Sequence, residues 1–451
     1  MLIRSISGIR GIVETHLTDE VIINYVRGAH QIYQAGAIIV GRDSRPSGIM
    51  ITNTVIDELI KLGRNVIFCD IVPTPTIQFM VEQTDAVGGL IVTASHNPEE
   101  WNGLKFVQDD GTFFSPAENE RLFQAVDKGI KTKKSIERGI VLEDKNVIQK
   151  HIIKIASLNC VDVYQIRKRQ FKVVIDAING AGAIAVPAML EALGCEVIPI
   201  NCEPTGDFVH GTEPLPHNLT ELCQAVIDNN ADIGFAVDPD ADRLAVVDEK
   251  GKPIGEEYTL VLATDGYIKT TGRKETFVAN LSTTLALDKL AEKHNCTVER
   301  SAVGEINVVQ KMQDLGANLG GEGNGGVILR QAHLGRDSLV GVAMVLNRLA
   351  QGDEPLSAIM NELPQFIIVK DRLDLNQTEE SIFDPKTVFD KAKIIFSDAE
   401  INTMDGLKFI WSDRWLHLRA SNTEPILRIY AESVDLKTAK NLIETLKSAI
   451  A

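Results

Sequence analysis

The chain has 451 residues, of which 44% are hydrophobic and 24% charged, as is ordinary for soluble globular proteins. Its formal net charge of −16 argues against nucleic acid or an anionic membrane as a partner, although an anionic small molecule can bind in a locally basic cleft. No apolar run is long enough to span a membrane, and the 6 cysteines lack Cys-x-x-Cys spacing, so we expect reduced thiols and a cytoplasmic protein.

A chain of this length predicts about three to four domains. Its most regular feature is an order of elements that recurs in three segments, which begin at Ala37, Lys172 and Thr276. Each segment has an apolar strand, a loop, a helix and a second strand, followed by another helix and a short apolar strand bounded by glycine. Strand–helix–strand order of this kind is typical of parallel α/β units.

In chain order, the predicted strands of these segments lie at 37–40, 65–68, 85–89, 172–175, 196–198, 231–235, 276–279, 297–298 and 316–320. The predicted helices lie at about 49–62, immediately before 194, and at about 285–294. The tail from about 367 instead predicts strands at 407–411, 415–419 and 426–430 and a helix from 436. We therefore expect an α/β fold of three similar domains with mixed, mostly parallel sheets and a C-terminal α+β domain, arranged around a central cleft. The expected boundaries are 1–150, 151–252, 253–366 and 367–451.

Three unlike loops follow the short apolar strands at the same place in the three segments. They read Thr93-Ala94-Ser95-His96-Asn97-Pro98, Asp238-Pro239-Asp240-Ala241-Asp242-Arg243 and Gly321-Glu322-Gly323-Asn324-Gly325-Gly326. Loops at the ends of parallel strands commonly carry function, so we expect the three to converge on one cleft.

The first loop offers Ser95 and His96 as candidate catalytic residues. On its own, Ser95 fits equally well a loop residue that caps the next helix. A serine-hydrolase pair is rejected because neighbouring residues in an extended loop point apart and no G-x-S-x-G elbow surrounds the serine. A phosphorylated Ser95 fits better, because a metal ion held by the second loop would polarise the phosphoryl oxygens.

The second loop alternates Asp238, Asp240 and Asp242, and a loop can fold three such carboxylates around one hard cation. An EF-hand calcium loop is the main rival, because Glu249 is twelfth from Asp238. However, Arg243 stands where the EF-hand needs glycine, and the flanking runs predict strands. A solvated acidic turn is the other alternative, and Mg²⁺ with a phosphate oxygen as a further ligand is preferred.

Cationic residues elsewhere suit an anionic substrate. Lys105 could hold a phosphate or shuttle a proton, although an ordinary surface lysine is an equal alternative. Arg10 is held among glycines near the N-terminus, and Arg42 and Arg45 supply further positive charge.

A polar segment near the C-terminus has the donors for a phosphate dianion, namely a guanidinium fork, hydroxyls and an amide. Its candidate substrate-binding residues are Arg419, Ser421, Asn422 and Thr423, with Arg428 beyond them. A simple polar hairpin turn is the alternative.

Together these motifs resemble the α-D-phosphohexomutase superfamily, which includes phosphoglucomutases, phosphomannomutases and phosphoglucosamine mutases, over essentially the whole chain. The resemblance implies that Ser95 carries the transferred phosphoryl group and contributes to the metal site with Asp238, Asp240 and Asp242. It implies Arg10 and Lys105 near the reacting hydroxyl and Arg243 beside the active phosphate. It further implies sugar reading by Glu322 and Asn324, and a grip on the distal phosphate by Arg419, Ser421, Asn422 and Thr423.

Two positions depart from the family pattern. Many members have a histidine at the end of the third loop, which we call the sugar loop, where this chain has Gly326. In the second loop, which we call the aspartate loop, Pro239 replaces a frequent glycine. The first change leaves the choice of sugar and the identity of the proton shuttle open. The start Ser5-Ile6-Ser7-Gly8-Ile9-Arg10-Gly11 and the sequence Gly323-Asn324-Gly325-Gly326 are similar to those of phosphoglucosamine mutases, and this similarity points to an amino sugar.

The resulting hypothesis is a reversible mutase that interconverts hexose 1-phosphate and 6-phosphate, with Mg²⁺ and a hexose 1,6-bisphosphate intermediate. Its partners would be small hexose phosphates, and the enzyme would be a monomer or homodimer. The same chemistry on glucose or mannose phosphates is the nearest alternative. A metal-dependent phosphatase and a non-catalytic sugar-phosphate sensor are the more distant ones.

Overall fold

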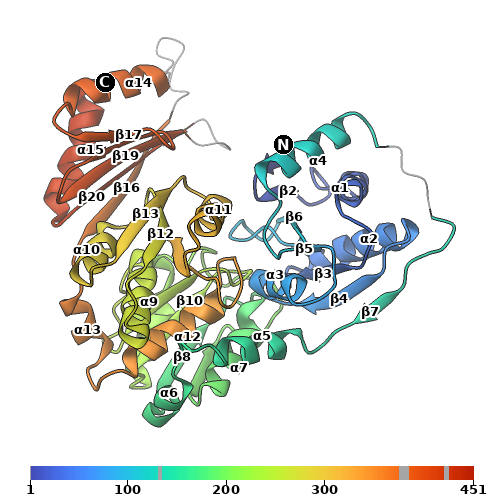
Figure 1. The fold of residues 1–451 in the computed structure, drawn as a ribbon, viewed down its shortest axis with the longest axis horizontal. Coiled ribbons are helices and arrows are strands. Elements are labelled where there is room, and N and C mark those ends of the chain that lie inside the picture. The colour runs from blue at the N-terminus through green and yellow to red at the C-terminus, as the bar shows by residue number, and fades with distance from the viewer. Residues whose placement is uncertain (1, 131–134, 375–384, 421–425, 451) are drawn as a thin grey trace.

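The computed structural model describes residues 2–130, 135–374, 385–420 and 426–450. They form four sheets with their covering helices, arranged in chain order around the molecule (Figure 1). Within these residues, no helix combines the length and apolar character that a membrane crossing requires. The predicted fold class is confirmed, with three α/β domains and a C-terminal α+β domain.

Domain I contains a seven-stranded sheet of order β1-β2-β6-β5-β3-β4-β7. Its elements are β1 (Ile3–Ser5), β2 (Gly8–Ile12), α1 (Asp19–Ile32), β3 (Ile38–Arg42), α2 (Ser47–Lys61), β4 (Val66–Ile71), α3 (Thr74–Glu82), β5 (Gly89–Val92), β6 (Trp101–Val107), α4 (Pro116–Asp127), β7 (Val141–Glu143) and α5 (Val147–Ala156). Strand β3 is parallel to β4 and β5, whereas β6 runs antiparallel to both β2 and β5. The antiparallel β1, β2 and β6 lie outside the predicted repeat.

The apolar run at 38–40 faces two cores because helices cover both faces of this sheet. Ile38 and Val40 pack with α1 and α2, whereas Ile39 packs with α3 on the opposite face. Strand residues alternate between faces, so a doubly covered strand needs continuous apolar sequence. This explains why the strand was predictable from its sequence.

Domains II and III each contain a four-stranded sheet, of order β11-β10-β8-β9 and β13-β12-β14-β15. Domain II comprises α6 (Val163–Arg169), β8 (Lys172–Asp176), α7 (Gly182–Ala192), β9 (Glu196–Ile200), η1 (Pro216–Asn218), α8 (Thr220–Asp228), β10 (Ile233–Val237) and β11 (Leu244–Asp248). Domain III comprises α9 (Glu256–Thr271), β12 (Thr276–Asn280), α10 (Leu285–Lys293), β13 (Thr297–Ser301), α11 (Glu305–Leu315), β14 (Leu319–Glu322), β15 (Gly326–Leu329), α12 (Ser338–Leu349) and α13 (Leu356–Glu362). In each sheet only one strand pair is antiparallel, namely β10 with β11 in domain II and β14 with β15 in domain III.

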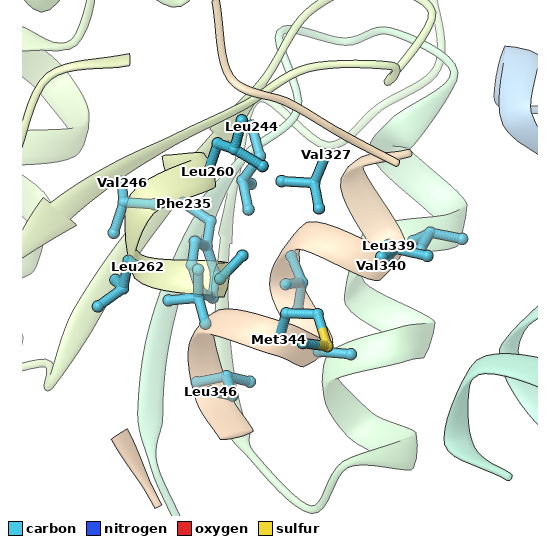
Figure 2. Packing of buried hydrophobic residues seen from close by; sticks show 14 of the residues in the cluster. Phe235, Leu244, Val246, Leu260, Leu262, Val327, Leu339, Val340, Met344 and Leu346 are labelled. Atoms are coloured by element: carbon cyan, nitrogen blue, oxygen red, sulfur yellow. The ribbon is translucent and has the colours of Figure 1, made fainter. Parts of the chain in front are cut away.

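These two domains share one hydrophobic core (Figure 2). Phe235 and Leu244 of the second sheet belong to the same buried cluster as Val327 of the third sheet and Met344 of α12. Shared burial of this kind ties the aspartate loop and the sugar loop to one rigid unit.

The C-terminal domain has a five-stranded antiparallel sheet of order β16-β20-β19-β18-β17. Its elements are β16 (Ile367–Asp374), α14 (Pro385–Ile395), β17 (Glu400–Asn402), β18 (Leu407–Ile410), β19 (Arg414–Ala420), β20 (Ile426–Ser433) and α15 (Leu436–Ile450). Helices α14 and α15 pack against one another, with Val388, Ala392 and Ile443 in one core.

Candidate active site

The serine loop lies at the carboxyl end of β5 and is fixed by buried polar contacts. Ser95 is 1% exposed and has a φ of +51°, in the left-handed region that residues other than glycine rarely adopt. Its N–H donates to Thr93 Oγ1 at 2.9 Å, and Arg45 Nη2 donates to its carbonyl oxygen at 2.8 Å. Thr93 Oγ1 in turn donates to Asp43 Oδ2 at 2.6 Å. Arg45 therefore builds the loop rather than offering its charge to a substrate.

The expectation that Ser95 and His96 point apart is wrong. Ser95 Oγ lies 3.3 Å from His96 Nδ1, because the left-handed φ of Ser95 turns the chain between the two side chains. Arg243 Nη2 lies 3.1 Å from the same ring nitrogen, which must therefore be an acceptor. Burial, and then the charges of Arg243 and Arg10, lower the pKa of His96 to about 2, so the imidazole stays neutral.

The aspartate loop connects the antiparallel strands β10 and β11, and this excludes the helix–loop–helix context of an EF-hand. Asp238, Asp240 and Asp242 are buried, and one carboxylate oxygen from each lies within 4.8 Å of the others. Among the described residues, Asp238 Oδ2, Asp240 Oδ1 and Asp242 Oδ1 have no hydrogen-bond partner. Buried carboxylates converging in this way fit a hard divalent cation such as Mg²⁺.

The three buried carboxylates repel one another. Burial raises the pKa of Asp238, and the negative charges of Asp242 and Asp240 raise it further. A bound cation would relieve the same repulsion.

Two side chains of domain I reach the aspartate loop of domain II. Lys105 Nζ of β6 donates to Asp240 Oδ2 at 2.7 Å, and Thr74 Oγ1 at the start of α3 donates to the same oxygen at 2.8 Å. Burial disfavours the charged form of Asp240, but Lys105 and then Thr74 outweigh it and lower the pKa. Lys105 is thus a buried ion-pair partner and not a surface lysine. The structure therefore brings the serine domain and the acidic trio together.

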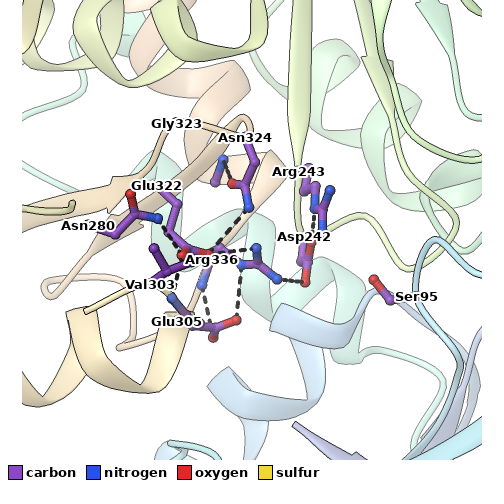
Figure 3. Close-up of polar contacts among 12 residues, drawn as sticks. Ser95, Asp242, Arg243, Asn280, Val303, Glu305, Glu322, Gly323, Asn324 and Arg336 are labelled. Carbon is purple, nitrogen blue, oxygen red and sulfur yellow. Dashed lines mark hydrogen bonds and ion pairs between the residues drawn. The ribbon is translucent and has the colours of Figure 1, made fainter. Parts of the chain in front are cut away.

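Arg243 and Arg10 both contact the serine loop, at His96 and Asn97. Arg243 Nη1 pairs with Glu213 Oε1 at 3.1 Å. Arg10 Nη1, from β2, donates to Asn97 Oδ1 at 3.0 Å. Figure 3 shows Ser95, Asp242 and Arg243 in one neighbourhood, with the serine hydroxyl turned toward the aspartate loop.

The sugar loop presents Glu322 at the end of β14. Glu322 Oε1 accepts from Asn280 Nδ2 at 2.7 Å and from the Gly304 N–H at 2.9 Å. Asn324 Nδ2 lies 3.4 Å from Glu322 Oε2, and Asn324 Oδ1 accepts from the Gly326 N–H at 3.2 Å. Burial opposes ionisation of Glu322, but Arg336 and then the hydrogen bonds from Asn280 and Gly304 outweigh it and lower the pKa. Glu322 and Asn324 thus lie side by side in the sugar loop.

Arg336 is a site residue that the sequence motifs did not reveal. It lies between the aspartate loop and the sugar loop (Figure 3). Its Nη2 pairs with Asp242 Oδ2 at 2.6 Å, its Nη1 with Glu322 Oε2 at 2.9 Å, and its Nε with Glu305 Oε2 at 3.1 Å. The signal available in the sequence was only an arginine just before Asp337, which caps α12.

The predicted phosphate-binding residues divide into described and undescribed ones. Arg419 of β19 and Arg428 of β20 are directly paired across the two strands, so their side chains lie on one face of the sheet. Arg419 Nε donates to Asp405 Oδ1 at 3.0 Å. Ser421, Asn422 and Thr423 lie outside the described residues. Like charges in directly opposed positions repel one another, and an anion would stabilise this pair.

Four family models match the chain in succession. They are described as phosphoglucomutase/phosphomannomutase alpha/beta/alpha domains I, II and III and C-terminal domain, and they match residues 2–133, 149–251, 255–366 and 384–449.

Named relatives cover nearly the full length. A phosphoglucomutase/phosphomannomutase of Thermococcus kodakarensis is 33% identical, over 97% of this chain and 96% of the relative. A phosphoglucosamine/phosphogalactosamine mutase of Sulfurisphaera tokodaii is 31% identical, over 98% of each chain. A crystal structure of a phosphoglucomutase/phosphomannomutase family protein from Burkholderia thailandensis superposes with a TM-score of 0.85 at 25% identity, covering 100% of this chain and 98% of that one. This chain therefore belongs to the phosphoglucomutase/phosphomannomutase family of the α-D-phosphohexomutase superfamily and is a phosphohexomutase.

Proposed function

We propose that this phosphohexomutase interconverts hexose 1-phosphate and hexose 6-phosphate through a phosphoserine at Ser95, with glucosamine phosphate as its preferred substrate. The observation that carries the mechanism is the meeting of domains I and II at three buried aspartates. Lys105 and Thr74 of domain I reach Asp240, and Arg243 contacts His96 beside Ser95. The boundaries at 150, 252 and 366 are proposed for the four domains that create this junction, and the four successive family models support such a division.

In the first step, phosphorylated Ser95 gives its phosphoryl group to the free hydroxyl of a hexose monophosphate. The bond from phosphorus to Ser95 Oγ breaks, a bond from phosphorus to the sugar oxygen forms, and the proton of the sugar hydroxyl passes through a base to Ser95 Oγ. The product is a hexose 1,6-bisphosphate. After it turns over in the site, its other phosphoryl group returns to Ser95 Oγ, and the isomeric monophosphate leaves.

Each side chain has a proposed role in this cycle. Lys105, Arg10 and Arg243 would neutralise the phosphoryl group in transit, because they converge on the serine and aspartate loops. His96, a neutral acceptor beside Ser95 Oγ, would orient the hydroxyl when it is unphosphorylated.

Binding would use the remaining loops. Glu322 and Asn324 would read sugar hydroxyls in either orientation of the intermediate. Arg419, Arg428 and the loop that carries Ser421, Asn422 and Thr423 would hold the phosphate that is not reacting.

The metal proposed for this site is Mg²⁺, held by Asp238, Asp240 and Asp242 and by the phosphate on Ser95. Their carboxylate oxygens without a hydrogen-bond partner among the described residues would supply the donor set. When bound, the ion would supply Lewis-acid stabilisation of charge on the phosphoryl oxygens.

The choice of glucosamine rests on the sugar named for the Sulfurisphaera relative and on the similarity of the N-terminal and sugar-loop motifs to phosphoglucosamine mutases. The Thermococcus relative carries the names of glucose and mannose phosphates, and these are the second candidate substrates.

The test measures both isomer and inorganic phosphate with glucosamine, glucose and mannose 1-phosphates, in the presence of Mg²⁺ and bisphosphate. We expect isomer with little free phosphate, and the highest kcat/KM on glucosamine 1-phosphate. Ser95→Ala should lower kcat/KM by roughly 10³-fold or more, because the covalent step is lost. Ser115→Ala, which removes the cap of α4 in the same domain, is the matched control and should retain turnover.

Stoichiometric release of inorganic phosphate by the parent protein would instead support a phosphatase. Full isomerase activity in Ser95→Ala would exclude the phosphoserine mechanism. A higher kcat/KM on glucose or mannose 1-phosphate would leave the mechanism intact and overturn only the choice of sugar.

A further inference from the structure

Arg336 joins three carboxylates that come from three different loops. Asp242 belongs to the aspartate loop, Glu322 ends β14 in the sugar loop, and Glu305 begins α11. Each of the three acids pairs with a different nitrogen of the guanidinium (Figure 3). A planar fork with fixed donor directions can hold three acids in this way, whereas the single ammonium of lysine cannot.

We propose that Arg336 is a positioning residue that fixes the sugar-reading Glu322 relative to the metal-binding Asp242, and that residue 326 must be glycine to leave room for it. This inference rests on the proposed function, because it assigns Glu322 to the sugar and Asp242 to the metal.

The space around Gly326 carries the second half of the proposal. A Cβ added to Gly326 would lie 2.3 Å from Arg336 Cδ and 2.9 Å from Arg336 Cγ. Both distances are shorter than a non-bonded contact between carbon atoms allows. Its next neighbour, Asn324 Oδ1, would be 3.1 Å away, and Gly326 does not have a positive φ. Any side chain at 326 therefore meets mainly the arginine and must displace it.

The backbone that carries Arg336 is anchored independently of its side chain. His333 Nε2 lies 3.2 Å from Asp337 Oδ2, and His151 Nε2 of α5 lies 3.0 Å from the same oxygen. Ser338 Oγ donates to the Ala241 carbonyl oxygen, inside the aspartate loop, at 2.7 Å. Because these contacts remain when Arg336 is truncated, we expect its variants to keep the fold at reduced stability, since the three acids lose their shared partner, and to lose the fixed position of Glu322.

The test is a double-mutant cycle of Gly326→Ala and Arg336→Ala in the full chain. Arg336→Ala should lower kcat/KM for glucosamine 1-phosphate by about 10-fold or more, mainly through KM, because Glu322 loses its fixed position. Gly326→Ala should cause a similar loss in the parent and a loss of less than about 3-fold in Arg336→Ala, because the side chain that it displaces is then absent.

A second readout does not depend on turnover. The dissociation constant of Mn²⁺, measured by electron paramagnetic resonance, should fall by about 3-fold or more in each single variant, because the guanidinium no longer competes for Asp242. The double variant should bind Mn²⁺ no more tightly than Arg336→Ala. Arg336→Lys should not restore the parent KM. The control is Arg348→Lys, which alters another buried arginine ion pair, to Asp265 of α9, and should stay within about 2-fold of the parent in both readouts.

Equal effects of Gly326→Ala in both backgrounds, or an unchanged Mn²⁺ dissociation constant, would overturn the proposal. If the parent isomerises no hexose phosphate, the proposed function fails, while the Mn²⁺ cycle still decides whether Arg336 and Gly326 act on the aspartate loop as a pair.

Discussion

Arg45 shows how much of the serine loop is held in place by one buried arginine. Its guanidinium is fully buried, pairs with Asp43, and donates to the carbonyl oxygens of Ser95 and Asn97. Buried charges are tolerated only when they are paired, so the loop and this ion pair depend on one another.

Replacing Arg45 with Met should destabilise the protein by about 3–5 kcal/mol, because Asp43 would keep its charge in a buried site without a partner. The control is Arg4→Met, which removes an exposed pair with Asp127 and should cost much less, because water screens that pair. Urea unfolding of both variants measures the difference. Equal losses in the two variants would show that the Arg45 pair does not hold the loop.

At the scale of residues, some features of the candidate active site could be predicted from the sequence and others could not. Ser95 and the aspartates stand in compact motifs, so their residue types and spacing were informative. The contact of Ser95 with His96 was missed because it depends on a left-handed φ, which a serine residue gives no reason to expect. Arg336 was missed because it reaches its three carboxylates only through tertiary structure.

At the scale of elements, the contact between β19 and the loop after β12 joins the C-terminal domain to domain III. His417 Nδ1 lies 3.0 Å from Ser282 Oγ, and its Nε2 lies 2.7 Å from the Asp405 carbonyl oxygen. Burial is the main cause that lowers the pKa of His417 to about 4; Lys408 and Arg419 lower it further, and Asp405 opposes them. The folded domain therefore requires a neutral imidazole.

Stability should accordingly depend on pH. The unfolded chain binds this proton near the ordinary histidine pKa of about 6.5, whereas the folded chain resists it down to about 4. The contribution is thus complete above about pH 6.5, falls as the pH decreases, and is lost below about pH 4. Between pH 7 and pH 5, the parent should lose about 2 kcal/mol more than His417→Gln.

Urea unfolding followed by tryptophan fluorescence measures this difference, because Trp411 and Trp415 both lie in the C-terminal domain. The exposed His217 of η1, replaced by Gln, is the control and should retain the parent's pH dependence. An identical pH dependence in His417→Gln and the parent would contradict the assignment.

The strands that could be predicted were those whose own residue pattern is enough to indicate a strand. Strands β3, β8 and β12 are short apolar runs between turns, and the structure has them within two residues of the predicted bounds. Strand β16 was not predicted because three successive charged residues, Lys370, Asp371 and Arg372, interrupt its apolar sequence. Its strand conformation comes from its pairing with β20. The antiparallel β6 was missed because its place between β2 and β5 depends on tertiary structure.

At the scale of the whole molecule, the repeat predicted the essential arrangement, because loops at equivalent places in similar domains converged. Domain I meets domain II through Thr74 and Lys105, and domains II and III share one core (Figure 2). The shared core was not predictable, because it depends on which faces of α9 and α12 pack together. The converged loops are what a reaction with a bisphosphate intermediate needs, since both phosphates must be held while the sugar turns over.

The most direct measurement of the central claim follows one phosphoryl group through the protein. The parent is incubated with Mg²⁺ and labelled hexose 1,6-bisphosphate, digested, and analysed by mass spectrometry, and a parallel sample is chased with unlabelled glucosamine 1-phosphate. The account predicts label on Ser95 that moves into sugar phosphate during the chase. Absence of label from Ser95, or its release only as inorganic phosphate, would contradict the account.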